Sequence, residues 1–149
     1  KLENLLEEII NSFKETSSKN ITLVSDGDRN KIDIQRSAEM IYGLRNFIGN
    51  AIKFSKSKVN IFLMSNDKEI KIVINDDGPG FPKDIIEKLG EPYIKSRSSE
   101  LNLNSGLGLG TFLGKTLLER QNAKLLFKDD KNLGGASVVI SWSPKNILL

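Results

Sequence analysis

Two asparagines and a lysine stand at helical spacing near the middle of the chain. Asn46 and Asn50 are one turn apart, and Lys53 follows on the same face. Two amide oxygens and one ammonium group therefore project into one site, which suits a triphosphate bound together with a metal ion. Because Mg²⁺ takes hard oxygen ligands and keeps several waters, an amide oxygen and phosphate oxygens make a reasonable ligand shell. Asn50 is the first candidate for the metal ligand.

These asparagines also have a plainer explanation. Asparagine is a poor helix former, and its amide is costly to bury without a partner. Taken alone, Asn46 and Asn50 are equally well explained by hydrogen bonds to a neighbouring loop. Lys53 and the two glycine-containing segments further along the chain favour a binding site instead.

The first glycine-containing segment covers residues 76–80. Asp76 is expected at the end of a strand, where its carboxylate can accept a hydrogen bond from the exocyclic amine of adenine. Gly78 and Gly80 would let a flat base lie against the backbone. A plain Asp-Gly turn is the alternative. Asp77 is expected to face the solvent.

The second glycine-containing segment opens a helix and offers bare backbone N–H groups to phosphate oxygens. It consists of Gly106, Leu107, Gly108, Leu109 and Gly110. No Gly-Lys-Ser/Thr follows, so it is not a Walker loop. A Rossmann turn is disfavoured, because the sixth position of a Gly-x-Gly-x-x-Gly pattern counted from Gly106 is not glycine and no strand is expected before it. A flexible hinge is the remaining alternative, but the three segments in this order point to ATP.

A long loop precedes the second glycine cluster. Residues 90–105 carry Ser, Asn, Gly and charged residues without periodicity, which predicts a mobile lid over a ligand. Lys95 and Arg97 could reach the terminal phosphate from this lid, although exposed loop cations are usually only solvated.

Composition limits the remaining function classes. The chain has 149 residues, of which 38% are hydrophobic and 28% charged, as expected for one globular domain. Without cysteine it has no disulfide or thiolate site, and without histidine it has no histidine ligand, base or phosphohistidine. The net charge is +3, but Lys and Arg are scattered, which disfavours nucleic-acid binding.

The same composition bears on location. No apolar run reaches the roughly 20 residues that cross a bilayer. The expectation is a soluble domain in the cytoplasm, a reducing compartment. Because the chain begins at lysine, it is expected to be a fragment of a longer protein.

Periodicity and turn residues predict an α/β (α+β) fold in a single domain, residues 1–149. Helices are expected at 2–13, with solvated glutamates, at 37–54 with Ser37 as N-cap, at 82–89 and at 109–121. Hairpins are expected from 21–25 with 31–34, from 59–63 with 70–74 and from 124–128 with 137–142. Together these elements predict a two-layer sandwich, with a mixed, mainly antiparallel sheet and helices on one face.

Nearly the whole chain resembles the catalytic ATP-binding domain of sensor histidine kinases, in the superfamily with the Bergerat fold that includes gyrase, MutL and the ninety-kilodalton chaperones. Residues 46–53 resemble the N box of that family, 76–80 its first glycine box and 106–110 its second. The Pro92-Tyr93 region resembles its F box. Residues 90–93 and 108–120 further resemble redox-responsive kinases of the RegB and PrrB type.

The resemblance implies a role for each matched residue. Asn50 would hold magnesium, and Asn46 and Lys53 would meet the phosphates; these three would be the catalytic residues. Asp76 would read the adenine amine. Phe54 would line the nucleoside pocket, and Tyr93, in the region that resembles the F box, would help to bind the nucleotide. The chain departs from the family where a threonine often follows the glycine of the final strand. Ala136 stands there, and Ser137 is the candidate replacement.

The resemblance also implies the activity. The domain would bind Mg-ATP and donate the γ-phosphoryl group to a histidine in the dimerisation and phosphoacceptor domain of its parent kinase. A response regulator would act downstream, and the parent is expected to be a membrane-bound homodimer. Gyrase-like ATPases carry a glutamate base where this chain has Asn46, so rapid hydrolysis is not expected. The rivals are an anti-sigma-factor-type serine kinase and, more distantly, a nucleic-acid-binding domain without enzymatic activity.

Overall fold

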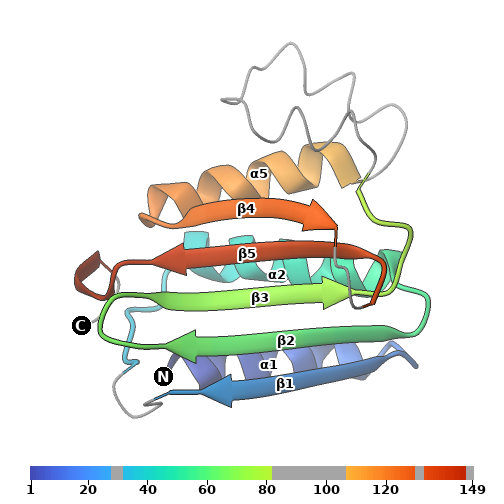
Figure 1. Ribbon diagram of the computed structural model, residues 1–149, viewed down its shortest axis with the longest axis horizontal. Helices are drawn as coiled ribbons and strands as arrows, with labels where there is room; N and C mark the ends of the chain where they lie inside the picture. The colour runs from blue at the N-terminus through green and yellow to red at the C-terminus, as the bar shows by residue number, and fades with distance from the viewer. Residues whose placement is uncertain (28–31, 82–106, 130–132, 147–149) are drawn as a thin grey trace.

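The computed structural model describes residues 1–27, 32–81, 107–129 and 133–146 (Figure 1). The predicted helix at 82–89 and the predicted lid at 90–105, with Tyr93, Lys95 and Arg97, lie outside the described residues, as does Gly106. Within the described ranges, no helix has the length and apolarity that crossing a membrane requires.

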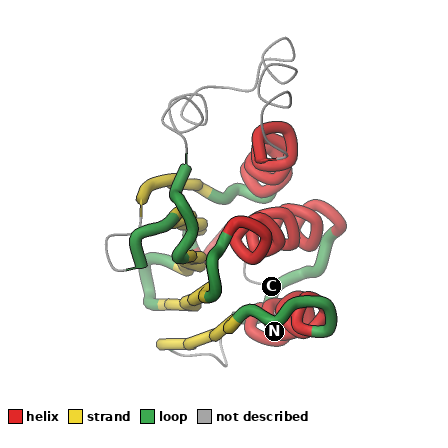
Figure 2. Tube along the Cα trace, turned by 90° about the vertical axis from the view of Figure 1, so that its right-hand side faces the viewer, coloured by secondary structure: helices red, strands yellow, loops and turns green. Residues whose placement is uncertain are grey.

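The fold has a sheet layer and a helix layer, as predicted. Its strands are β1 (Asn20–Asp26), β2 (Lys58–Ser65), β3 (Ile70–Asp76), β4 (Lys124–Asp129) and β5 (Ala136–Trp142), in the spatial order β1-β2-β3-β5-β4. Its helices are α1 (Leu2–Lys14), α2 (Ala38–Phe54) and α5 (Leu107–Arg120), with a 3-10 turn at Pro144–Asn146. Figure 2 shows the three helices stacked on one side of the sheet. β1 and β2 are parallel, and the other neighbours are antiparallel.

Helix α2 carries the asparagines, and its sequence sets where it begins and which face it buries. The Ser37 hydroxyl oxygen accepts a hydrogen bond from the Met40 N–H at 3.1 Å, which satisfies one of the donors that a helix start leaves open. Met40, Leu44 and Ile48 are buried and recur at helical spacing. The face next to this stripe is therefore held at the edge of the core.

The sheet register brings the end of β3 beside the start of β5. Alternate residues of β3 are buried, ending at Asp76, and Asn75 pairs with Ser137. Asp76 also pairs with Val59 at the start of β2. A side chain at the end of β3 therefore lies next to the loop that leads into β5.

The predicted hairpin of residues 21–25 with 31–34 is wrong. β1 pairs in parallel with β2, from Asn20 opposite Lys58 to Asp26 opposite Met64. The following segment packs against α1: Ile32 is buried, and its carbonyl accepts from the Leu2 N–H at 3.1 Å. A parallel partner comes from a distant part of the chain, so local patterning could not indicate it.

Two other expectations need correction. Helix α5 begins at Leu107, two residues before its predicted start, so most of the second glycine cluster forms its first turn. The glutamates of α1 were expected only to face the solvent, but two of them also form hydrogen bonds with other segments. Glu8 accepts two hydrogen bonds from Arg36 at 2.8 and 2.9 Å, and Glu3 accepts from the Ser25 hydroxyl at 3.0 Å.

Candidate functional site

A cavity of about 180 Å³ lies between α2, α5, the end of β3 and the start of β5. Much of its lining is apolar, including Phe47, Ala51, Phe54, Ile74, Phe81 and Val138. Polar groups reach it from Asn50, Asp76 and Thr111. An apolar slot with a few fixed polar groups is typical of a small-molecule site.

Asp76 is fixed by the backbone around it. Its side chain is buried, and its Oδ1 accepts from the Gly78 N–H at 2.8 Å and from the Ala136 N–H at 3.2 Å. A methyl group at Gly78 would lie 2.3 Å from the Phe54 carbonyl oxygen, so only glycine fits there. The carboxylate thus joins the end of β3 to the start of β5 at the wall of the cavity.

The two asparagines of α2 meet the start of α5. The Asn50 Nδ2 lies 3.3 Å from the Thr111 Oγ1 and 3.5 Å from the Asn46 Oδ1. A methyl group at Gly110 would lie 3.1 Å from the Asn46 Oδ1, so the missing side chain leaves room for the amide. The first turn of α5, whose N–H groups have no partner within the helix, therefore lies beside both amides.

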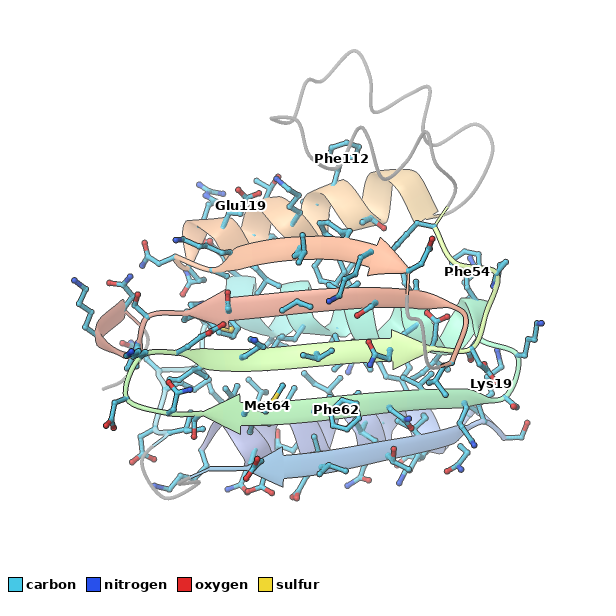
Figure 3. The ribbon with its side chains drawn as sticks, in the orientation of Figure 1. Lys19, Phe54, Phe62, Met64, Phe112 and Glu119 are labelled. Carbon is cyan, nitrogen blue, oxygen red and sulfur yellow. The ribbon has the colours of Figure 1, made fainter. Side chains whose placement is uncertain are left out.

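Lys53 and Phe54 lie at the end of α2. Phe54 lines the cavity and packs against Phe112, and Figure 3 shows it at the end of the sheet where β3 finishes. Lys53 is exposed, and its ammonium nitrogen lies 5.2 Å from the centre of the Phe54 ring. Lys53 does not line the cavity but lies beside Phe54, which does.

The remaining predicted site residues fall into two groups. Gly80 lines the cavity and has a φ of 82°. For Leu107, Gly108 and Leu109 the structure places only the backbone, in the first turn of α5.

Asp77 does not simply face the solvent. Its carboxylate accepts from the backbone N–H groups of Lys56, Ser57 and Lys58, at 2.8 to 3.2 Å, and from the Ser57 hydroxyl at 3.0 Å. Burial acts to raise the pKa of this carboxyl, but the hydrogen bonds outweigh it and hold the pKa at about 2. Asp77 therefore stays ionised and ties the end of β3 to the turn after α2.

Sequence reasoning missed part of the lining. Phe47 lines the cavity, and its position three residues before Asn50 on the same helix is the signal for it. Thr111 also has a signal in the sequence, because it is a polar residue directly after a glycine cluster in an apolar helix. Ala136 lines the cavity, but Ser137 does not; as the next residue of β5 it points to the other face of the sheet, so it is no replacement for the family threonine.

Residues 35–146, which include every part of this cavity, match the sequence profile of the histidine kinase-, DNA gyrase B- and HSP90-like ATPases. The chain belongs to this ATPase family. Its similar curated proteins are sensor histidine kinases, and it is a catalytic domain of that type.

The sequence of this ATPase domain is 42% identical over 106 residues to the sensor histidine kinase RegB of Cereibacter sphaeroides, covering 68% of this chain and 23% of RegB. It is 29% identical over 101 residues to CpxA of Escherichia coli, covering 68% of this chain and 22% of CpxA. It is 30% identical over 100 residues to SaeS of Staphylococcus aureus, covering 64% of this chain and 28% of SaeS. The chain therefore spans about a quarter of the length of these relatives.

Solved structures show the same fold. The ATPase domain superposes on a nucleotide-free catalytic domain of the histidine kinase ThkA with a TM-score of 0.75 and 19% identity, over 96% of this chain and 94% of the other. The ATP-binding domain of PrrB from Mycobacterium tuberculosis gives a TM-score of 0.65 and 20% identity, over 94% of this chain and 91% of the other.

Proposed function

We propose that this domain binds Mg-ATP and donates the γ-phosphoryl group to a histidine outside the chain, within a two-component signalling system. The observation that carries the proposal is the convergence on one cavity of Asn50 from α2, with Asn46 beside it, a backbone-held carboxylate at the end of β3 and Thr111 from the glycine-containing start of α5. Family membership supports ATP as the nucleotide.

The adenine base would occupy the apolar part of the cavity. Phe47, Ile74 and Val138 offer surfaces for a flat ring, and Asp76 is the only carboxylate among the described lining residues. The Asp76 carboxylate would accept from the exocyclic amine of adenine. Because backbone N–H groups already fix this carboxylate, little side-chain freedom is lost when the base binds.

The phosphates would lie where α2 meets the start of α5. The partly positive N-terminal end of α5 favours anions, and the absence of a side chain at Gly110 lets phosphate oxygens approach its backbone. Asn46 would contact phosphate oxygens from α2. Lys53, exposed beside Phe54, would add positive charge near the terminal phosphate.

The residues present fit a magnesium ion held largely by the nucleotide. No cluster of three or more His, Cys, Asp or Glu suited to a metal occurs among the described residues, so a cage made only by the protein is not available there. An amide oxygen beside the phosphates, with waters completing the shell, is a set that magnesium accepts. Asn50 would supply that oxygen, and the ion would neutralise phosphate charge when bound.

The site favours transfer to an acceptor over hydrolysis of ATP. Among the described residues that line the cavity, the only carboxylate is Asp76, which is engaged with backbone N–H groups at the adenine end. The described lining therefore offers no second carboxylate to activate water at the phosphate end. Transfer of a phosphoryl group rests mainly on positioning and charge neutralisation, which amides, N–H groups and a bound cation can supply.

The acceptor and the further partners would lie in other parts of a larger protein. The chain contains no histidine, and it matches about a quarter of each curated relative. Residues 1–149 would form one catalytic domain. It would work with a dimerisation and phosphoacceptor domain in a homodimeric, membrane-bound parent, on the cytoplasmic side. The phosphoryl group would pass from the histidine of that domain to a response regulator.

Label transfer tests this function directly. The chain would be incubated with ATP labelled at the γ-phosphate, magnesium and the parent's dimerisation and phosphoacceptor domain. The expected result is acid-labile label on a histidine of that domain, and none when magnesium is chelated. Bound nucleotide without label on histidine would contradict the proposal. Label on a serine of a partner protein, identified by mass spectrometry, would favour the anti-sigma-factor-type kinase.

Asp76→Ala tests the adenine assignment. The affinity for a fluorescent ATP analogue is expected to fall by about 100-fold, because the base loses its acceptor and two backbone N–H groups lose theirs. Asp76→Asn keeps one oxygen for the backbone and helps to separate recognition from folding. Asp67→Ala, in the turn between β2 and β3, serves as the control. Unchanged affinity in folded Asp76→Ala would remove Asp76 from the site.

A further inference from the structure

Thr111 places a hydroxyl group inside the protein, between the start of α5 and the middle of α2. Its side chain is only 1% exposed, and its Oγ1 lies 3.3 Å from the Asn50 Nδ2. Threonine is a weak helix former, and a buried hydroxyl is costly unless it is hydrogen-bonded. A valine would fill the same space without that cost. The hydroxyl at this position is therefore best explained by its contact with Asn50.

The contact determines which end of the Asn50 amide faces α5. An asparagine amide has a donor end and an acceptor end of nearly equal shape, and its partners decide between the two orientations. A threonine within a helix can give its own proton to a carbonyl oxygen one turn earlier, which leaves its oxygen to accept. The Asn46 Oδ1, 3.5 Å from the Asn50 Nδ2, is a second acceptor on the same side.

The oxygen end of Asn50 consequently faces away from Thr111. Among the described residues, no side chain donates a hydrogen bond to this oxygen; both side-chain hydrogen bonds of Asn50 use its Nδ2. An amide oxygen can bind a hard cation, whereas the amide nitrogen cannot. If the amide turned over, it would present its NH₂ group to the ion.

We propose that Thr111 is a positioning residue, which holds the Asn50 amide with its oxygen toward the magnesium ion of the bound nucleotide. The inference rests on the proposed function, since it requires that the cavity takes a magnesium nucleotide. Thr111 would contribute to the magnesium-dependent part of the affinity. It would contribute little to binding of the base, which depends on Asp76.

The test measures the affinity of this chain for a fluorescent ATP analogue, with magnesium and with EDTA. The ratio of the two dissociation constants is the magnesium-dependent gain. Thr111→Val keeps the shape and removes the acceptor. This variant is expected to reduce the gain by about tenfold, the effect of losing one hydrogen bond that orients a ligand. Its affinity in EDTA is expected to stay within about twofold of the wild type.

Two further variants make the result specific. Thr111→Ser retains a hydroxyl and is expected to restore most of the gain. Thr116→Val, a matched change more than one turn further along α5, is expected to behave as the wild type. Thermal unfolding followed by circular dichroism establishes that each variant is folded. Should Thr111→Val fail to fold, the comparison of Thr111→Ser with Thr111→Ala replaces it.

Failure of this inference differs from failure of the proposed function. A wild type that binds no nucleotide in either condition would overturn both. A wild type with a magnesium-dependent gain that folded Thr111→Val retains in full would overturn only the positioning role. A folded Thr111→Ser that loses the gain as completely as Thr111→Val would show that shape matters and not the hydroxyl, and would also overturn it.

Discussion

Two neighbouring carboxylates at the end of β3 have different tasks. Asp76 points into the helix side of the sheet and lines the cavity, with its Oδ1 held by the N–H groups of Gly78 and Ala136. The Asp77 side chain points the other way, and its carboxylate accepts hydrogen bonds from the backbone N–H groups of the turn after α2. Successive side chains of an extended chain point to opposite sides, so adjacent residues of the same type can differ in function.

The tie made by Asp77 depends on pH. The pKa of its carboxyl is about 2 in the folded protein, below the roughly 3.9 of an unperturbed aspartate. A lowered folded pKa means that the stabilisation is full above the unfolded pKa and is lost as the pH falls through about 2. Asp77→Asn is expected to lower the free energy of unfolding by about 1 kcal/mol at pH 7, and by much less near pH 2.

Urea unfolding at the two pH values measures this effect. Asp67→Asn removes an exposed charge without removing such a tie and serves as the control. The nucleotide affinity of Asp77→Asn is expected to match that of the wild type. An equal loss of stability at both pH values would show that the ionised carboxylate is not the stabilising group.

Helix α2 depends on a cation at its C-terminal end. The Lys19 ammonium group donates to the carbonyl oxygens of Ile52 at 2.6 Å, Ser55 at 2.7 Å and Lys53 at 3.3 Å. These carbonyls include acceptors that the end of a helix leaves without a partner, and the helix dipole favours positive charge there. Lys19, labelled in Figure 3, therefore holds the end of α2 that carries Phe54.

Lys19→Met tests this cap, because methionine keeps most of the aliphatic stem and removes the charge. The free energy of unfolding is expected to fall by about 1–2 kcal/mol, measured by urea titration. The affinity for the ATP analogue is expected to fall by only about two- to threefold, through looser placement of Phe54. Lys68→Met, in the exposed turn before β3, is the control. A stability equal to that of the wild type would exclude a capping role.

The whole chain is expected to unfold as one unit, and its single tryptophan reports on this. Trp142 is the last residue of β5, whose first residue is Ala136, and it is 2% exposed. Its Nε1 donates a hydrogen bond to the Gln121 carbonyl oxygen at 3.2 Å. It belongs to the same core as α1, α2 and the central strands. Unfolding should therefore shift tryptophan emission to longer wavelength at the temperature at which circular dichroism changes.

Nucleotide should raise that temperature without changing the emission of the folded state, since Trp142 lies far from the cavity. At a ligand concentration of 100 times Kd, the expected stabilisation is about 2.7 kcal/mol. At the same ligand concentration Asp76→Ala, which is expected to bind about 100-fold more weakly, should keep only about 0.4 kcal/mol of this stabilisation. Two separate thermal transitions would contradict the assignment of residues 1–149 to one domain.

One face of the sheet is not covered by the three described helices (Figure 2). The helices cover the other face, and Phe62 and Met64 lie on the open side of β2 in Figure 3. Val24 and Leu126, on the two edge strands, are each more than half exposed. The buried core therefore lies between the helices and one face of the sheet. The strand residues that line the cavity are every second residue of β3 and β5, because only those point to that face.

Local patterns in the sequence specify most of the individual helices and strands and the three segments of the site. Ser37 and the apolar stripe define α2, alternation defines β2 and β3, and helical spacing places Asn46 beside Asn50. These features depend on neighbours within a few residues, so a linear pattern contains them. Together with the resemblance, they were enough to predict the fold class and ATP.

The complete fold, in contrast, sets how distant segments meet. It paired β1 in parallel with β2, gave Asp77 a structural role, placed Lys53 outside the cavity and brought Thr111 to Asn50, 61 residues away in the chain. Each of these depends on the packing of α2, α5 and the sheet against one another. Contacts of that kind are fixed by the complete core, which no local stretch of sequence specifies.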